Sequence, residues 1–314
     1  MITTIKHSYL RRITQQKILP SMQSHISTAS SEKRFATRIV RFVDENGQVR
    51  CGQAPPPSKS LCSGTTVELI DNSDPFGKQK LTGKTAVIKK LLIPIVPSQI
   101  LGIGLNYRKH AQETKKAEPM FPIVFIKALN SLQDPEEPIK IPRIASNPPE
   151  VDYECELAVL VGKDCRNVSK REALSFVAGY TCANDVSARR WQGIKGGGQY
   201  SRAKSFDTFC PIGPVLVTPS EIPDPQKLRL STRVNGELLQ DSSTGDMIFD
   251  VAELISQLSQ DTTLLKNTLI LTGTPEGVGC ARNPPIYLKP GDAVHVEIEN
   301  IGILKNPVTA AAVL

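Results

Sequence analysis

The sequence predicts a mostly β protein of the α+β class, and three observations support this prediction. Most apolar segments are short and either rich in β-branched residues or alternating in hydrophobicity, as strands are. Asn235-Gly236 separates two of these segments, and this dipeptide is a strong short-range signal of a β-hairpin. Segments with helical spacing are few, so strands do not alternate with helices as a doubly wound nucleotide-binding fold requires.

Strands are expected along the whole chain from residue 38 onward. Their expected positions are residues 38–43, 48–51, 100–104, 123–127, 155–161, 214–217, 228–234, 238–240, 269–271 and 293–299, with one more inside 86–97. Two helices are also expected. Ser169 and Glu172 have the spacing of a capping box and predict a helix over residues 173–177. Asp250 similarly predicts a helix over residues 251–258.

The basic residues are concentrated at the N-terminus. The first 31 residues contain no acid and are rich in Ser, Thr, Lys and Arg, which is typical of a mitochondrial transit peptide. Residues 1–35 are therefore predicted to direct the chain to the mitochondrial matrix; a basic disordered tail without an address is the alternative. Beyond residue 34 the chain has 32 basic and 30 acidic residues, and this near neutrality argues against a nucleic-acid surface.

Segment lengths and cysteine spacing exclude further classes of protein. No apolar stretch approaches the ~20 residues that cross a bilayer, so no membrane partner is expected. The seven cysteines are odd in number and lack C-x-x-C spacing, which argues against a disulfide framework or a zinc site. Residues 36–99 are predicted to form a small N-terminal domain, and residues 100–314 a larger, strand-rich one.

Glu154 and Glu156 are the most informative pair in the sequence. They are separated by one residue and lead into the apolar run 157–161, which is typical of a buried strand. Residues i and i+2 of a strand point to the same face, so the two carboxylates are expected side by side. Carboxylates this close repel each other and raise each other's pKa. A divalent cation that prefers oxygen ligands, Mg²⁺, Mn²⁺ or Ca²⁺, removes this conflict.

Asp185 is the best candidate for a third ligand. It follows an apolar stretch, at the expected end of a strand. Three carboxylates and water molecules suit octahedral Mg²⁺ or Mn²⁺ and leave positions open for a substrate. By spacing alone, ordinary surface acids on an edge strand are the stronger explanation of these three residues.

Five motifs in order resemble the fumarylacetoacetate hydrolase superfamily. They are Gly102-x-Gly104-Leu105-Asn106-Tyr107-x-x-His110, Glu154-x-Glu156, Asp185-Val186-Ser187-Ala188-Arg189, Ala203-Lys204-Ser205-Phe206-Asp207 and Leu271-Thr272-Gly273-Thr274-Pro275. The resemblance extends from about residue 100 to the C-terminus. It is strongest to a mitochondrial branch of domain-containing proteins that includes oxaloacetate tautomerases.

This resemblance implies a fold, a cofactor and a partner. The fold would be a mixed β-sandwich or β-roll, with residues 100–314 as the catalytic, metal-binding domain. Mg²⁺ or Mn²⁺ would be held by Glu154, Glu156 and Asp185, the substrate would be a small 2-oxo acid, and the chain would form a homodimer.

Four further polar residues are expected to act on the substrate. Arg189 and Lys204 would match its negative charge, Arg189 as a bidentate fork and Lys204 as a point charge with a catalytic role as well. Gln192, which faces the active site in the resemblance, can donate to an enolate or a carboxylate. Thr274 lies in a Gly-rich turn and can offer its hydroxyl to a carboxylate. Taken alone, Lys204 would be an ordinary surface lysine.

His110 and Glu113 are expected to transfer protons. They lie three residues apart, so a short helix places them on one face, where Glu113 can orient the imidazole. Such a dyad can shuttle a proton or activate water. In the family this stretch resembles a lid.

Three functions agree with these residues. The first is a metal-dependent tautomerase that interconverts enol- and keto-oxaloacetate by proton transfer at C3, and the mitochondrial leader favours it. The second is an acylpyruvate hydrolase or oxaloacetate decarboxylase. The third is a non-catalytic ligand-binding protein of the same fold, against which the cost of burying like charges without use argues.

Overall fold

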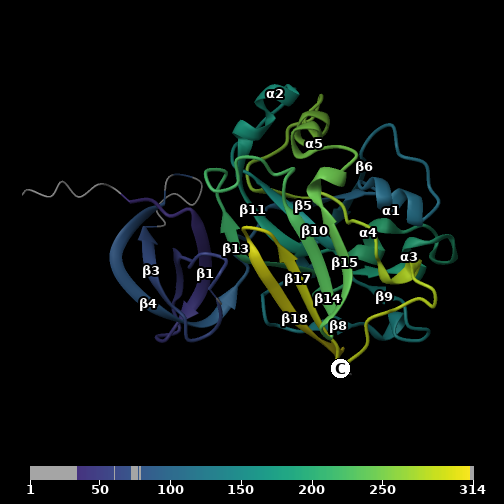
Figure 1. Ribbon diagram of the computed structural model, residues 1–314, viewed down its shortest axis with the longest axis horizontal. Helices are drawn as coiled ribbons and strands as arrows, with labels where there is room; N and C mark the ends of the chain where they lie inside the picture. The colour runs from purple at the N-terminus through teal and green to yellow at the C-terminus, as the bar shows by residue number, and fades with distance from the viewer. Residues whose placement is uncertain (1–33, 60, 72–76, 78, 312–314) are drawn as a thin grey trace, which may run out of the picture. The chain divides into compact units, whose positions relative to one another are not determined.

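The computed structural model describes residues 34–59, 61–71, 77 and 79–311 (Figure 1). The predicted transit peptide, residues 1–35, lies almost entirely outside these residues. In the described part of the chain strands far outnumber helices, which confirms the prediction of a mostly β fold.

The largest sheet contains eleven strands. Ten of them follow one another in the order β2 (Val49–Gln53), β3 (Thr66–Asp71), β4 (Lys80–Leu92), β1 (Arg38–Asp44), β13 (Cys210–Val217), β11 (Val177–Asn184), β10 (Cys155–Val161), β16 (Thr268–Leu271), β5 (Gln99–Gly104) and β6 (Ile123–Lys127). The remaining strand, β7 (Leu132–Gln133), pairs with β13 off this path. The pairs β16–β5 and β13–β7 are parallel and β10–β11 is antiparallel, so the sheet is mixed, as the resemblance implies.

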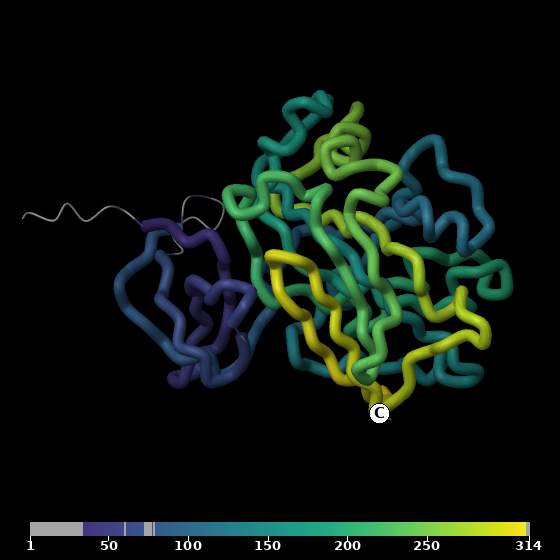
Figure 2. The backbone as a smooth tube through the Cα atoms, viewed as in Figure 1, coloured from purple at the N-terminus to yellow at the C-terminus, as the bar shows by residue number. Residues whose placement is uncertain are grey.

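A second sheet has five strands. Their order is β15 (Glu237–Ser243), β14 (Arg229–Val234), β17 (Ala293–Ile298), β18 (Gly302–Ala310) and β8 (Ile139–Ile141). Figure 2 shows the green chain of β14 and β15 beside the yellow chain of β17 and β18, although some fifty residues separate them in sequence. Asn235 and Gly236 both have positive φ and close the β14–β15 hairpin, as predicted. A short ladder joins β9 (Val151–Asp152) and β12 (Ser187–Ala188).

Helices are short and few in the described chain. They are α1 (Arg108–Glu113), α2 (Lys170–Ala173), α3 (Arg189–Gln192), α4 (Tyr200–Lys204) and α5 (Val251–Leu258), with 3₁₀ turns at Leu129–Ser131, Arg143–Ala145, Leu174–Phe176, Ile194–Gly196, Thr244–Asp246 and Gly279–Ala281. Helix α5 begins as predicted, because the Asp250 carboxylate accepts the Glu253 N–H at 2.7 Å.

The predicted helix over residues 173–177 is wrong in its limits. Helix α2 ends at Ala173, and Val177 already begins β11, where it pairs with Val161. The Ser169 hydroxyl donates to the Glu172 carboxylate at 2.5 Å and caps no backbone N–H. Strand pairing therefore overrides the local helical signal at this point.

Strand β10 lies in the interior of the large sheet and is buried on both faces. Leu157 and Val159 pack into one hydrophobic cluster, whereas Ala158 and Leu160 pack into another. This double burial explains why the run is apolar at every position after Glu156 and does not alternate with polar residues. The same packing on both faces holds in place the strand that carries Glu156 and directly follows Glu154.

The described chain bears on the predictions about membrane spans, cysteines and the N-terminal domain. None of its helices is long and apolar enough to cross a membrane. All seven cysteines are free, as expected. Strand β1 pairs with β13, so the strands of the predicted 36–99 domain continue the sheet of the larger domain. The boundary at residues 99 and 100 stays a prediction.

Candidate metal centre and active site

The strand pair β10–β11 brings the three predicted metal ligands together. Cys155 pairs with Asn184 in the antiparallel register, and beyond this pair the Asp185 N–H donates to the Glu154 carbonyl oxygen at 2.9 Å. Glu154 and Asp185 therefore lie side by side at the ends of neighbouring strands. Glu156 follows two residues after Glu154 on the same face. Ligand oxygens of the three carboxylates lie within 4.8 Å of one another.

Burial distinguishes these carboxylates from ordinary surface acids. All three are buried, and they lie at interior strands of the sheet, which excludes the edge-strand alternative. Burial raises the pKa of Glu156 well above its ordinary value, and the charges of Asp185 and Glu154 raise it further. Burial also acts to raise the pKa of Glu154, but Lys204 and Arg189 outweigh it and lower that pKa to about 2.

Two buried lysines contact the carboxylates. Lys204, at the end of α4, places Nζ 2.6 Å from Glu154 Oε2 and also pairs with Asp185 Oδ2. Lys127, at the end of β6, places Nζ 2.6 Å from Asp185 Oδ1 and donates to the Phe209 carbonyl oxygen at 2.9 Å. The side chains of Lys127 and Asp185 have no exposure to solvent, so this ion pair lies in the interior of the protein.

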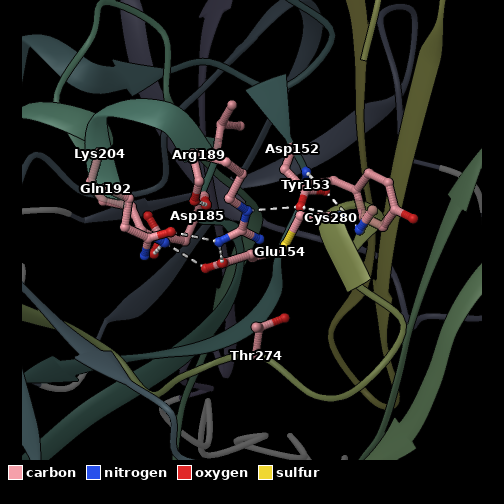
Figure 3. Close-up of polar contacts among 12 residues, drawn as sticks. Asp152, Tyr153, Glu154, Asp185, Arg189, Gln192, Lys204, Thr274 and Cys280 are labelled. Carbon is pink, nitrogen blue, oxygen red and sulfur yellow. Dashed lines mark hydrogen bonds and ion pairs between the residues drawn. The ribbon is translucent and has the colours of Figure 1, made fainter. Parts of the chain in front are cut away.

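Arg189 lies between two carboxylates, as Figure 3 shows. Its Nε donates to Asp152 Oδ2 at 2.8 Å, and its Nη1 lies 2.6 Å from Glu154 Oε1. Asp152 is itself saturated, because its oxygens also accept the N–H groups of Tyr153, Gly279 and Cys280 at 2.8–2.9 Å. Asp152 therefore orients Arg189 and holds the Gly279 turn against the site.

The charges of this site are suited to a divalent cation. Four carboxylates face three cations: Asp152, Glu154, Glu156 and Asp185 against Lys127, Arg189 and Lys204. Among the described residues Glu156 is the one carboxylate of the four that forms no ion pair; it accepts only the Gly273 N–H, at 2.7 Å. A cation ligated by oxygen donors would supply the missing partner of this buried group, so the residues present fit Mg²⁺ or Mn²⁺.

A cavity of about 150 Å³ opens beside this cluster. It is lined by Ile103, Gly104, Leu105, His110, Thr114, Lys116, Ile123, Phe125, Glu154, Glu156, Arg189, Gln192, Tyr200, Lys204, Thr274 and Cys280. The structure therefore places the predicted metal ligands, substrate-binding residues and catalytic residues around one cavity. Glu113 and Asp185 are the exceptions, because they contact lining residues but do not line the cavity themselves. Burial raises the pKa of the Cys280 thiol to about 12, so this thiol faces the cavity in its neutral form.

Three hydrogen-bond donors of the lining have no acceptor among the described residues. Arg189 Nη2 is buried and unpaired. Gln192 accepts from Arg189 Nη1 at 3.0 Å through Oε1, and this leaves its amide NH₂ group without a partner. The Thr274 hydroxyl accepts one hydrogen bond, and its own hydrogen has no acceptor. These donors suit a ligand rich in anionic oxygens.

His110 and Glu113 form the predicted dyad on α1. His110 Nδ1 lies 2.7 Å from Glu113 Oε1, and the second Glu113 oxygen accepts the Gly277 N–H at 2.9 Å. His110 is 9% exposed and lines the cavity. When Nδ1–H donates to the carboxylate, Nε2 is the basic nitrogen and is available to a ligand.

Three residues of the site were not assigned a role from the sequence. For Lys127 the sequence held a weak signal of burial. It lies two residues after Phe125 in an expected strand, so the two side chains point to the same, buried face. Asp152 precedes the two glutamates, but nothing local indicates that it binds Arg189. Gln240 lies in a hairpin far along the chain, and no sequence signal connects it to the site.

Comparison with known sequences places this site in a family. Residues 99–309 match the family described as "Fumarylacetoacetate (FAA) hydrolase C-terminal". The chain is 37% identical over 316 residues to "Oxaloacetate tautomerase fahd2, mitochondrial" of Xenopus laevis, covering 98% of this chain and 97% of that protein. It is 43% identical over 218 residues to "Oxaloacetate tautomerase FAHD2A, mitochondrial" of Homo sapiens, covering 69% and 68%.

Solved structures share the fold. A 2-hydroxyhepta-2,4-diene-1,7-dioate isomerase from Mycobacterium marinum aligns with a TM-score of 0.73 at 36% identity, covering 88% of this chain and all of that one. A fumarylacetoacetate hydrolase from Exiguobacterium antarcticum aligns with a TM-score of 0.70 at 36% identity, covering 87% and 99%. The fold class predicted from the resemblance is therefore confirmed.

Proposed function

The chain belongs to the fumarylacetoacetate hydrolase family, and on that basis we propose that it is a divalent-metal-dependent oxaloacetate tautomerase. It would interconvert the enol and keto forms by moving the C3 proton. One observation carries the proposal: a buried carboxylate cluster, three donors without an acceptor in the described part of the chain and a His–Glu dyad converge on one small cavity. The relatives named oxaloacetate tautomerase support the choice of substrate.

Glu154, Glu156 and Asp185 are the proposed ligands of Mg²⁺ or Mn²⁺. When bound there, the cation supplies positive charge and Lewis acidity beside the 2-oxo acid head. Arg189 and Thr274 donate to the carboxylate oxygens of the substrate. Gln192 donates to the oxygen on which negative charge develops as the C3 proton leaves.

His110 is the proposed proton carrier. Glu113 holds Nδ1 and stabilises the imidazolium that forms when Nε2 takes the C3 proton. The same nitrogen then delivers this proton to the C2 oxygen, which gives the enol; in the reverse direction it takes the enol proton and delivers it to C3. Lys204 pairs with Glu154 and Asp185 and holds both carboxylates in place. It also lines the cavity, where its ammonium group would face the substrate.

A direct assay tests the proposal. Ultraviolet decay of the enol band of oxaloacetate should be accelerated by the purified protein with Mg²⁺ and return to the uncatalysed rate with EDTA. If the purified protein does not accelerate this decay, the tautomerase proposal is wrong. Release of pyruvate from acetylpyruvate or oxaloacetate at a comparable rate would instead favour the hydrolase or decarboxylase alternative.

We further propose that two copies of the chain form a homodimer through the outer edge of β6. This strand ends the large sheet, so one side of its backbone is available for pairing. Exposed apolar side chains gather along it and its flanks: Met120, Phe121, Ile123, Val124, Ile126 and Leu129. A patch of this kind on a soluble protein indicates an interface, and an edge strand can pair antiparallel with its own copy around a twofold axis.

A mitochondrial location is also proposed, and the relatives named mitochondrial support it. Residues from 34 onward form one compact unit by themselves. Deleting residues 2–33 should therefore leave tautomerase activity intact in vitro and leave the protein in the cytosol of transfected cells. Mitochondrial import of the truncated chain would contradict the transit-peptide proposal.

A further inference from the structure

We propose that Gln240 is a positioning residue that fixes the Thr274 hydroxyl as a hydrogen donor to a carboxylate of the substrate. The inference rests on the proposed function, because it assumes that the cavity binds a 2-oxo acid. Gln240 is 1% exposed and lies outside the cavity lining, on β15 of the second sheet. It would therefore act only through the residues that it holds.

The hydrogen bonds of Gln240 determine the orientation of its amide. Oε1 accepts the N–H of Cys155 at 2.9 Å and the hydroxyl of Thr232 at 2.8 Å. Nε2 donates to the Thr274 hydroxyl oxygen at 2.9 Å and to the Pro275 carbonyl oxygen at 3.1 Å. A backbone N–H can only donate and a carbonyl can only accept, so the reversed amide would face two mismatched backbone groups. All four bonds are satisfied in one orientation only.

This orientation decides what Thr274 can do. Its hydroxyl oxygen already accepts from Nε2, so its hydrogen must find an acceptor elsewhere. Thr274 is 4% exposed and lines the cavity, and the described residues offer that hydrogen no acceptor. In the view of Figure 3, Thr274 lies below Glu154 and Arg189. The hydroxyl is therefore prepared to donate into the cavity, which favours a carboxylate there over another donor.

Gln240 also connects parts of the site that come from distant segments. Cys155, which it holds, lies between the ligands Glu154 and Glu156. The loop that it holds through Thr274 bonds to Glu156 at one end, through the Gly273 N–H, and to Glu113 at the other, through the Gly277 N–H. Gly273 has φ +97° and an added Cβ would lie 2.7 Å from Asn106 Cβ, so this turn has little freedom to adjust.

Oxalate binding in the presence of Mg²⁺ tests the inference without turnover. Thr274→Val removes the donor, and Gln240→Glu replaces Nε2 by an oxygen that accepts the Thr274 hydrogen and turns it away from the cavity. Each change should weaken oxalate binding roughly 10- to 100-fold, the range for one charge-assisted hydrogen bond. The double variant should bind no more weakly than either single variant, since both remove the same bond.

Two controls separate this role from a general structural one. Thr232→Val removes the other hydroxyl that bonds to Gln240 and leaves Nε2 untouched, so oxalate affinity should stay within twofold of wild type. Thr274→Ser keeps the hydroxyl and should restore binding. In tautomerase assays, Gln240→Glu should raise KM for oxaloacetate while kcat changes by a few fold at most. If Gln240→Glu does not fold, Gln240→Asn withdraws Nε2 from Thr274 and should give the same loss.

The possible results are distinct. Additive losses in the double variant, wild-type binding by Gln240→Glu or Gln240→Asn, or no oxalate binding by wild-type protein would each overturn the positioning role. Non-additive losses in a protein without tautomerase activity would support it and overturn the proposed reaction alone.

Discussion

Lys127 shows how much of this site depends on a single buried charge. Its ammonium group contacts Asp185 and the Phe209 carbonyl oxygen, and the side chain has no exposure to solvent. Taking these charges out of water is costly, and the pair offsets the cost only while both members are present. Removing Lys127 takes away one of the two buried ammonium partners of Asp185 and leaves Lys204 as the other.

Lys127→Met is therefore expected to destabilise the metal-free protein by up to about 3–5 kcal/mol, the cost of leaving a buried charge without a partner. Urea unfolding with EDTA measures this loss. Lys90→Met is the matched control, because Lys90 pairs with Glu137 at 2.8 Å but both side chains are at least 40% exposed. That exposed pair should contribute at most about 1 kcal/mol. Equal losses in the two variants would contradict the structural role of Lys127.

Glu156 is the residue on which metal binding should depend most. It alone of the four carboxylates has no ion pair among the described residues, and burial, together with the charges of Asp185 and Glu154, raises its pKa. Glu156→Gln keeps the shape and removes the charge, so Mn²⁺ affinity should fall at least about tenfold and tautomerase activity should fall with it. Calorimetric titration with Mn²⁺ measures the affinity. Glu150→Gln is the matched control, because Glu150 is a buried carboxylate that pairs with Arg190 outside the cluster. This variant should bind Mn²⁺ like wild type.

At the scale of residues, the ligand set was predictable and its partners were not. Glu154, Glu156 and Asp185 are conspicuous because strand periodicity and motif spacing are local properties of the sequence. The roles of Lys127, Asp152 and Gln240 arise from contacts across more than thirty residues of chain. Long-range contacts of this kind leave at most a weak local trace in the sequence, as the position of Lys127 in its strand does.

Among the secondary-structure elements, helix α1 links proton transfer to the rest of the site. The sequence predicted that a short helix would bring His110 and Glu113 together, and it does. What the sequence could not show is the bond from the Gly277 N–H to the second Glu113 oxygen, 164 residues along the chain. This bond anchors the dyad to the loop that carries Thr274.

Glu113→Gln is expected to lower kcat roughly 10²- to 10³-fold, because the amide cannot stabilise the imidazolium of His110. Mn²⁺ affinity should be unchanged, since Glu113 lies outside the ligand cluster. Stopped-flow decay of the enol band gives kcat. Gln112→Ala alters an exposed residue of the same helix and should keep wild-type activity. An unchanged kcat in Glu113→Gln would remove the dyad from the mechanism.

Where a predicted helix or strand is wrong or missing, the local sequence pattern competes with strand pairing between distant segments. Strands with apolar runs or strict alternation, such as β10 and β17, were expected within a residue or two. The expected helix over 173–177 gives way to β11, because pairing with β10 outweighs a weak capping box. Strands β3 and β18 were missed, since Glu68, Lys305 and Asn306 interrupt their apolar patterns with polar residues.

For the whole molecule, the sheet ends in a strand that is unusually apolar for an edge. Val124 and Ile126 are 46% and 58% exposed on β6, where natural edge strands usually carry charges that prevent pairing. Phe125 and Ile123 of the same strand line the cavity, so a partner at this edge would lie next to the active site. The homodimer is thus expected to protect both the edge and the cavity.

Light scattering of the purified protein should give the mass of two chains, and Ile126→Lys should give the mass of one. A lysine at the centre of a self-paired edge would place two like charges close together across the twofold axis, which opposes pairing. Ile303→Lys is the control, because Ile303 is 40% exposed on β18 of the other sheet and should not change the mass. Because the lining of each cavity includes Ile123 and Phe125, the monomeric variant should also lose activity at dilutions where the wild type keeps it. A wild-type protein that runs as a monomer, or an Ile126→Lys variant that stays dimeric, would show that the edge of β6 is not the interface.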